Sequence, residues 1–278
     1  MSTEPTLAAP TLADAGFADI AHDPVRFEQA ARLATCLDVD LTVLDHGVLP
    51  ALWHWAFFHA EVPTAGLGVD GHPRRRAEMD DFPQRMWVGG RVRVVRPLRI
   101  GVDAERVSRI ARADVKEGGA GRFWLVTIAH TIEQEGAPHV EEEQDLVFRS
   151  AGALAPVGHD THTPPDDEWV EERVGDPKLL FRFSAVTANA HRIHYDHPYA
   201  TEVEGYPDLV VHGPLTAILL AELARTRRGT DAREVSYRAR APHVANRRFW
   251  LAGSPSDQGA SLRAVRADGE TAMTLEVR

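Results

Sequence analysis

One segment of the chain, residues 213–225 (GPLTAILLAELAR), combines strong helix formers with apolar residues on nearly every side of the helix axis. Such a helix needs other structure around it, because apolar surface is unfavourable in water. Segments in which apolar and polar residues alternate follow it, at 233–243, 247–256, 260–267 and 271–278. The sequence therefore predicts a curved antiparallel sheet that wraps around a central helix.

The first half of the chain repeats this order of elements in outline. Helices are predicted at 24–37, with Asp23 as the cap and a proline at the first position, and at 50–60, where apolar residues again surround the axis. A Gly/Pro/Arg-rich stretch at 64–83 is expected to be an exposed loop. Alternating strands separated by glycine-rich turns are expected at 86–150.

The second half begins with a short predicted strand at 179–186 and a long irregular segment at 187–211. Two units of helix and antiparallel strands side by side form an α+β double hotdog, although identity between the halves is too low to prove a duplication. The expected divisions are a flexible N-terminus at 1–20, an N-terminal hotdog at 21–150, a linker at 151–177 and a C-terminal hotdog at 178–278.

Composition narrows the function classes. The 278 residues carry a formal net charge of −10, which argues against a general nucleic-acid binder. The lone cysteine, Cys36, excludes an intrachain disulfide, and no apolar run approaches the ~20 residues that span a bilayer. The first residues lack the basic and apolar regions of a secretory signal, so a cytoplasmic protein is expected. Two fused units can pair within one chain, which leaves monomer and homodimer both open.

Polar residues crowd into one part of the irregular segment. Within ten residues it holds Asn189, His191, His194, Asp196 and His197. A polar surface loop would also have this composition. We expect no metal, because histidines at every third position do not converge on one ion without helix or strand geometry. Acid–base catalysis suits the group better, since imidazole accepts or donates a proton near neutral pH and an amide holds water by hydrogen bonds.

The predicted central helix begins with His212, Gly213 and Pro214. Proline fits the first helical position, and glycine lets a ligand approach the backbone closely. The N–H group at a helix N-terminus can donate to an oxyanion, such as the oxygen of an enolate. A simple capping role for Gly213 is the alternative, and the neighbouring histidines favour the oxyanion role.

Several motifs together resemble a known enzyme family. They are LPALWHW, QRMWVGG, EEEQDLVFR, FSAVTANAHRIHYD and EGYPDLVVHGPL, in matching order over roughly residues 49–250. The pattern resembles the MaoC-like hydratases, whose motif is D-x-N-P-x-H followed by H-G at the central helix. More closely, it is similar to the type-2 3-hydroxyacyl-thioester dehydratases, a group that includes mesaconyl-C4-CoA and itaconyl-CoA hydratases. Asn189 stands at the acid position of the wider superfamily, in keeping with the closer relatives, and His194 and His212-Gly213 match the remaining positions.

This resemblance implies a double hotdog and a hydro-lyase that adds or removes water across the α,β double bond of an acyl thioester. The carrier would be CoA or ACP, the acyl group could be a short dicarboxylic one, and no metal or redox cofactor is implied. His194 would transfer protons, Asn189 would orient the water or hydroxyl group, and the Gly213 N–H would polarise the thioester carbonyl.

Substrate contacts are expected from four further side chains, Arg85, Arg192, His191 and His212. Guanidinium groups bind carboxylates and phosphates through two parallel hydrogen bonds, so either arginine could meet CoA or a free substrate carboxylate. The alternative function is a non-catalytic acyl-thioester-binding module, or a subunit of a hetero-oligomeric dehydratase. Asn189 at the acid position gives that alternative some weight, and the intact His194 opposes it.

Overall fold

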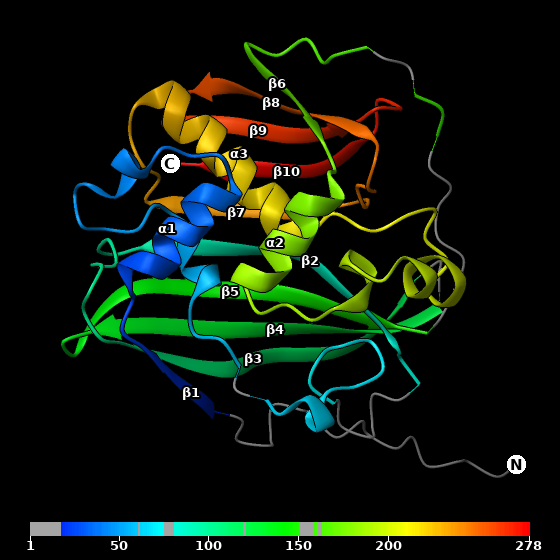
Figure 1. Ribbon diagram of the computed structural model, residues 1–278, viewed down its shortest axis with the longest axis horizontal. Coiled ribbons are helices and arrows are strands. Elements are labelled where there is room, and N and C mark those ends of the chain that lie inside the picture. Colours follow the sequence, from blue (N-terminus) through cyan, green and yellow to red (C-terminus); the bar gives the residue numbers. More distant parts are fainter. Residues whose placement is uncertain (1–17, 61, 75–80, 119–120, 151–157, 161–162) are drawn as a thin grey trace, which may run out of the picture.

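The computed structural model describes residues 18–60, 62–74, 81–118, 121–150, 158–160 and 163–278. Within them, one ten-stranded antiparallel sheet has the order β1-β3-β4-β5-β2-β7-β10-β9-β8-β6, and α1, α2 and α3 lie on one side of it (Figure 1). The strands are β1 (Ala18–Asp23), β2 (Gln84–Val94), β3 (Ala104–Gly118), β4 (Gly121–Gln134), β5 (Ala137–Arg149), β6 (Trp169–Val174), β7 (Glu234–Ala239), β8 (Arg248–Ser256), β9 (Gly259–Arg266) and β10 (Thr271–Val277). The helices are α1 (Phe27–Cys36), α2 (Pro177–Val186) and α3 (Gly213–Arg228), with shorter helical turns η2 (Leu41–Leu44), η3 (Trp53–Ala56), η4 (Thr64–Gly66), η6 (Arg192–His194) and η7 (Tyr199–Val203).

The sheet consists of two halves of five strands that meet where β2 pairs with β7. Each half begins with an edge strand followed by a helix, and the hydrogen bonds after these helices repeat. The Val39 N–H donates to the Ala34 carbonyl at 2.9 Å after α1. The Asn189 N–H donates to the Ser184 carbonyl at 2.8 Å after α2. The backbone thus shows a repeat that the low identity between the halves does not reveal.

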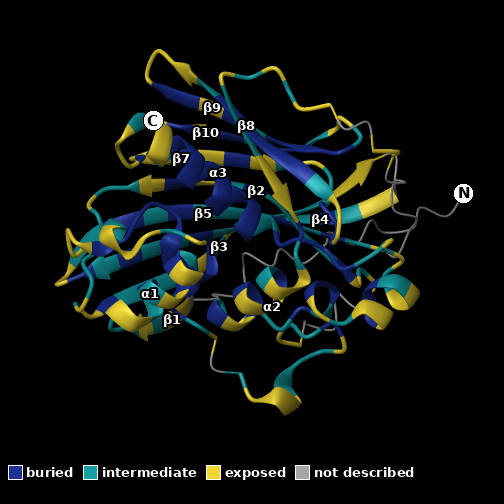
Figure 2. Ribbon diagram, turned by 45° about the horizontal axis from the view of Figure 1, so that its top comes forward, coloured by how far each residue is buried: buried dark blue, intermediate teal, exposed yellow. Residues whose placement is uncertain are grey.

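The central helix predicted in the second half is confirmed. Every residue from 215 to 224 of α3 is buried, and Figure 2 shows the helix in dark blue against the sheet. It packs on β8, β9 and β10, as its apolar circumference requires. No helix within the described ranges is both long and apolar enough to cross a membrane.

The helix predicted at 50–60 is wrong. Only the short turn η3 forms there, because Leu52 before it (φ 70°) and Phe58 after it (φ 56°) have left-handed backbone conformations that end a helix. The indole of Trp53 is fixed instead by donating to Glu222 at 2.9 Å, so the segment packs against α3. Among the described residues, α3 is therefore the long helix at the centre of the fold.

The strand predicted at 179–186 is also wrong, because α2 occupies this segment. Asp176 accepts the Lys178 N–H at 2.8 Å, and Pro177 stands at the first helical position. These two start signals outweigh the alternating pattern of FRFSAV.

Helix α1 begins at Phe27, three residues later than predicted. Val25 has φ 45°, which interrupts the helix, and the Asp23 carboxylate accepts the Val25 N–H instead of capping the helix.

Two edge strands lie in ranges that were expected to be irregular. β1 includes the end of the range 1–20 predicted to be flexible, and residues 1–17 lie outside the described part. β6 lies inside the predicted linker 151–177 and pairs with β8 over its whole length, whereas 151–157 and 161–162 are not described. The strands predicted at 86–150 and after α3 are confirmed as β2–β5 and β7–β10.

Candidate active site

The irregular segment between α2 and α3 folds into a tight turn. Ala188 has φ 48°, which reverses the chain after α2. The Asn189 carboxamide oxygen then accepts the His191 N–H at 3.0 Å, so this side chain stabilises the turn that leads into η6. His194, the last residue of η6, is thereby placed on the interior side with 7% of its surface exposed.

The environment of His194 fixes its tautomer. Its Nδ1 lies 2.7 Å from the Val210 carbonyl oxygen, so Nδ1 carries the proton and Nε2 keeps a free lone pair. Burial lowers the pKa of His194 to about 4, although the Val210 hydrogen bond acts in the opposite direction. The imidazole is therefore neutral at pH 7 and can accept a proton at Nε2.

The His212 ring packs against one face of the His194 ring. The two rings are stacked with centroids 3.6 Å apart, and His212 Nε2 lies 2.9 Å from the Ser184 hydroxyl. His212 is fully buried and burial holds its pKa well below the usual range. In this structure the His212 ring is therefore shielded from solvent and packs against the His194 ring.

Gly213 begins α3 directly after His212, next to the stacked rings. The first N–H groups of a helix have no acceptor within the helix, so this end of α3 presents donors towards an anionic oxygen. A Cβ at Gly213 would lie 2.6 Å from Cε3 of Trp87 in β2, which is too close for any side chain. Glycine thus allows Trp87 of the first half to close over the helix terminus.

A loop of the first half, around residues 69–72, contacts the histidine-rich segment 189–198. The Arg192 N–H donates to the Asp70 carbonyl at 2.9 Å, and the Arg192 guanidinium donates to the Val69 carbonyl at 3.0 Å. Gly71 (φ 91°) approaches so closely that a Cβ there would lie 1.7 Å from the Ala190 carbonyl oxygen. The prediction of an exposed loop at 64–83 is therefore wrong for this part, where Asp70 is only 6% exposed.

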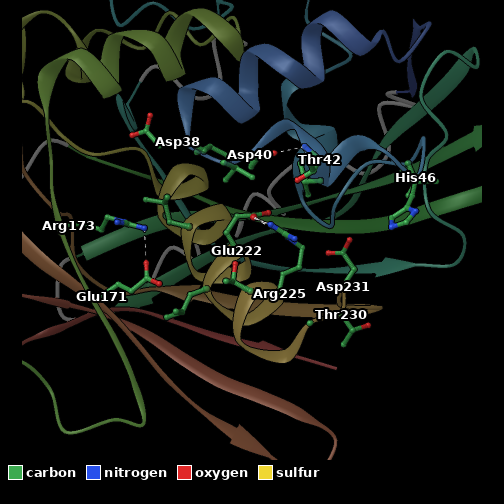
Figure 3. A pocket seen from close by; sticks show the side chains of 18 residues that line it. Asp38, Asp40, Thr42, His46, Glu171, Arg173, Glu222, Arg225, Thr230 and Asp231 are labelled. Carbon is green, nitrogen blue, oxygen red and sulfur yellow. Dashed lines mark hydrogen bonds and ion pairs between the residues drawn. The ribbon is translucent and has the colours of Figure 1, made fainter.

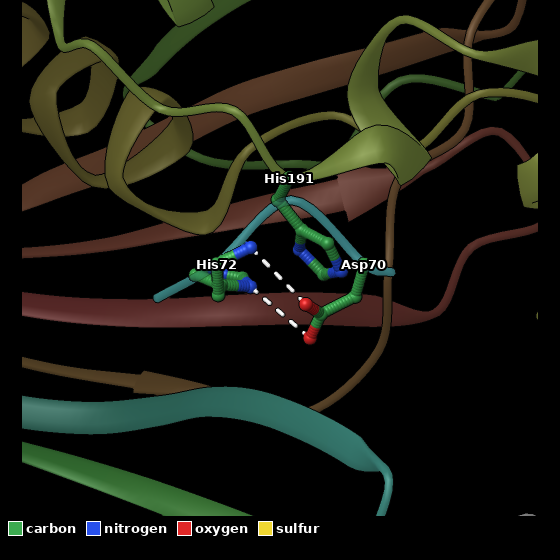
Figure 4. A group of neighbouring side chains, drawn as sticks. All are labelled: Asp70, His72 and His191. Carbon is green, nitrogen blue, oxygen red and sulfur yellow. Dashed lines mark hydrogen bonds and ion pairs between the residues drawn. The ribbon is translucent and has the colours of Figure 1, made fainter. Parts of the chain in front are cut away.

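This loop adds a fourth imidazole, that of His72, to those of His191, His194 and His212. His72 lies beside His191 with ring centroids 4.3 Å apart, and His191 meets His194 edge to face at 5.3 Å. Asp70 accepts the His72 N–H at 3.1 Å, and its second carboxylate oxygen lies 3.5 Å from His72 Nδ1 (Figure 4). Burial and the neighbouring His72 lower the pKa of His191 to about 2. Sequence patterns do not single out Asp70 or His72, because they lie about 120 residues before the motif.

The two predicted arginines have different positions. Arg192 donates to Asp196 at 2.7 Å and lies over the Tyr199 ring at 4.1 Å, so its guanidinium is held by the motif's own residues. Arg85 of β2 lies near enough to His191 for its charge to lower the pKa of that imidazole, and its guanidinium is 6.0 Å from the centre of the Phe148 ring.

The histidines of the motif do not form the metal site that their spacing could suggest. The His197 side chain is exposed and lies 3.7 Å from Asp208. Within the described residues, the group that could accommodate a metal ion is instead Asp70, His72 and His191, whose oxygen and nitrogen atoms lie within 4.8 Å of one another.

A separate cleft lies at the C-terminal end of α3 (Figure 3). It has a volume of about 700 Å³ and many carboxylates, among them Asp38, Glu171 and Asp231. Its Glu222 is already paired with Arg225 at 2.6 Å. Sixteen helical residues, about 24 Å, separate the two ends of α3. We place the chemistry at the N-terminal end, because the neutral imidazoles and the free helix donors converge there.

Comparison with known proteins identifies the family of the chain. The family model of hydroxyacyl-thioester dehydratase type 2 matches residues 52–245. The chain is 44% identical over 232 residues to the mesaconyl-C4-CoA hydratase of Chloroflexus aurantiacus, which covers 82% of this chain and 83% of that protein.

Solved structures support the fold. HtdX of Mycobacterium tuberculosis superposes with a TM-score of 0.70 at 18% identity, over 94% of this chain and 99% of that one. Another protein of that organism, described as a double hotdog, gives 0.52 at 14% identity, over 96% and 97% of the two chains. The predicted α+β double hotdog is thereby confirmed. The chain belongs to the hydroxyacyl-thioester dehydratase type 2 family, and it is a hydro-lyase that adds water to acyl thioesters or removes it from them.

Proposed function

We propose that the enzyme hydrates the α,β double bond of a short enoyl-CoA, and catalyses the reverse reaction, with His194 as the base. The observation that carries this is the Nδ1 bond to Val210, which leaves the Nε2 lone pair of a neutral imidazole free beside the N-terminus of α3. His194 takes a proton from water while the water oxygen bonds to the β carbon. The electron pair of the double bond moves towards the thioester carbonyl, and the Gly213 N–H stabilises the resulting enolate oxygen. Protonation of the α carbon completes the addition.

The Asn189 side chain fits the role of holding the water. Its oxygen is engaged by the His191 N–H, which leaves the amide nitrogen to donate to the water or to the product hydroxyl group. An amide cannot replace the carboxylate of the wider superfamily as a base. In this proposal Asn189 therefore orients the nucleophile, while His194 alone removes its proton.

The acyl group we propose is a dicarboxylic one of four or five carbons, carried on CoA. The Chloroflexus relative is named for mesaconyl-C4-CoA. Arg85 supplies a positive charge at the site, and a guanidinium group can bind the free carboxylate of such a substrate with two hydrogen bonds. The reaction moves only protons and water, so we also propose that it needs no metal or redox cofactor. A cytoplasmic location, and function as a monomer or a homodimer, belong to the same proposal.

The test is the ultraviolet absorbance of the enoyl thioester. Crotonyl-CoA, mesaconyl-C4-CoA and itaconyl-CoA are incubated with the wild-type enzyme and with His194→Ala. We expect loss of absorbance with at least one substrate, and a rate at least about 100-fold lower in the variant.

The matched control is His197→Ala, since this exposed imidazole belongs to the same segment but lies away from the site. It should retain wild-type activity. Equal rates in His194→Ala and the wild type would contradict the role of His194. No turnover of any thioester by the wild type would instead favour a binding module.

A further inference from the structure

The site described so far holds bases but no evident acid. His191 and His194 have pKa values lowered to about 2 and about 4, and His212 is fully buried. All three are therefore neutral at pH 7. Asn189 cannot release a proton. Hydration nevertheless requires a group that gives a proton to the α carbon, and dehydration requires the same group to remove it.

The loop from the first half brings a suitable pair to this place. His72 contacts His191, and it lies close enough to His194 for its charge to lower the pKa of that ring. Its neighbour Asp70 is a buried carboxylate 3.5 Å from His72 Nδ1, an arrangement that orients an imidazole and stabilises its charged form. The His72 side chain is 18% exposed, so it can reach a substrate and exchange its proton with solvent.

We propose that His72 is the second acid–base residue of the reaction, and that Asp70 positions its ring. This inference rests on the proposed function. During hydration His194 accepts one proton from water as the carbon–oxygen bond forms. The His72 imidazolium then gives its Nε2 proton to the α carbon as the enolate collapses to the thioester. His194 returns its proton to solvent and His72 takes one up, so the sum is one water molecule added to the double bond.

A metal ion bound by Asp70, His72 and His191 would be another use of the same side chains. The positive charge of Arg85, which already disfavours protonation of His191, also opposes a cation there. Asp70 is further engaged by the His72 N–H. These contacts favour proton transfer over metal binding.

The experiment compares His72→Ala with the wild type on the thioester that the wild type turns over fastest. We expect kcat to fall at least about 100-fold with KM changed by less than about threefold, because a lost acid affects the chemical step. Added imidazole should enter the gap left by the side chain, which is partly open to solvent, and raise kcat of the variant about tenfold. Asp70→Asn should lower kcat less, again with little change in KM.

The control is His46→Ala, an exposed histidine in the cleft at the other end of α3, which should behave as the wild type with and without imidazole. A wild-type kcat in His72→Ala would overturn this inference and leave the proposed function standing. A loss that imidazole does not restore would mean a structural role and overturn it too. Activity that EDTA abolishes and Zn²⁺ restores would also overturn this inference, in favour of a metal site. An inactive wild type would instead overturn the proposed function itself.

Discussion

Gly213 combines two requirements in one residue. Its N–H is at the start of α3, where the first helical N–H groups have no acceptor within the helix, and its missing side chain leaves room for Trp87, whose Cε3 would lie 2.6 Å from an added Cβ. We expect Gly213→Ala to displace Trp87 or the start of α3 and to lower kcat/KM at least about tenfold, since small displacements of catalytic groups are costly. Thioester hydration followed by absorbance measures this.

Gly118→Ala is the matched control for Gly213→Ala. A Cβ at Gly118 would meet only the Phe123 ring, at an ordinary contact of 3.4 Å, in a hairpin far along the sheet. Its activity should equal that of the wild type. If Gly213→Ala were equally active, the close approach of Trp87 would have no bearing on the site.

The catalytic residues that the sequence predicts lie close together in the chain. Asn189, His194 and Gly213 lie within 25 residues, and the turn and helix signals around them are local. His212 is predicted as a substrate contact, yet its position under the His194 ring depends on three-dimensional packing. Asp70 gives no local signal either, because its burial results from contact with a segment about 120 residues away.

At the scale of elements, the loop that carries Asp70 and His72 is held by the fit of Gly71 against Ala190. We expect Gly71→Ala to push this loop off the motif and lower kcat/KM at least about tenfold, because the Cβ would lie 1.7 Å from a carbonyl oxygen. Steady-state kinetics and a thermal melt of the same preparation measure the effect on activity and on stability.

Gly101→Ala is the control that separates the steric clash of Gly71→Ala from the backbone strain of a side chain at positive φ. Gly101 also has a positive φ, 79°, but a Cβ there would meet nothing within 4 Å. Both variants should lose on the order of 1 kcal/mol of stability from the strained conformation. Only Gly71→Ala should lose activity, and equal activities would show that docking of the loop is not required.

Elements were predictable from sequence where periodicity and end signals agree. Apolar residues on nearly every side of the α3 segment indicate a buried helix, and alternating residues in the β2–β5 segments indicate strands. Both predictions are confirmed, and ten consecutive residues of α3 are buried. Prediction fails at 50–60, where apolar composition suggests a helix but left-handed residues at Leu52 and Phe58 prevent it. It fails at 179–186 because the Asp176 cap and Pro177 start the helix α2 there.

For the molecule as a whole, the site requires both halves of the chain. The second half provides His194 and the start of α3, and the first half provides Trp87, Arg85 and the loop with His72. The pairing of β2 with β7 fixes these contributions relative to one another. The fusion therefore does more than place two units in one chain, because neither half alone contains the full set of groups.

Four buried histidines make the stability of the whole molecule depend on pH. Burial lowers the pKa values of His191, His194 and His243 to about 2, 4 and 3, and that of His212 well below normal. Between pH 6.5 and 4 the unfolded chain thus binds more protons than the folded one. Their contribution is fully present above pH 6.5 and is lost as the pH falls. We expect a loss on the order of 1–2 kcal/mol per histidine by pH 5, measured as a lower urea midpoint than at pH 7.5.

Other shifted groups leave this direction unchanged. The pKa of Glu142 is lowered to about 2, so its protonation destabilises the folded state only below pH 4.5. The pKa of Asp231 is raised, which stabilises the folded state as the pH falls, but this is one carboxyl group against four histidines. The His243 ring packs against Phe249, at 4.4 Å between ring centres, while the His243 backbone carbonyl accepts the Val211 N–H. His243→Leu removes the imidazole and keeps this backbone bond, so it should reduce the pH dependence by about one histidine's share and leave thioester hydration unchanged. Equal urea midpoints of the wild type at pH 5 and pH 7.5 would contradict this prediction. They would mean that the buried imidazoles gain protons in the folded protein, where water or a carboxylate stabilises their charge.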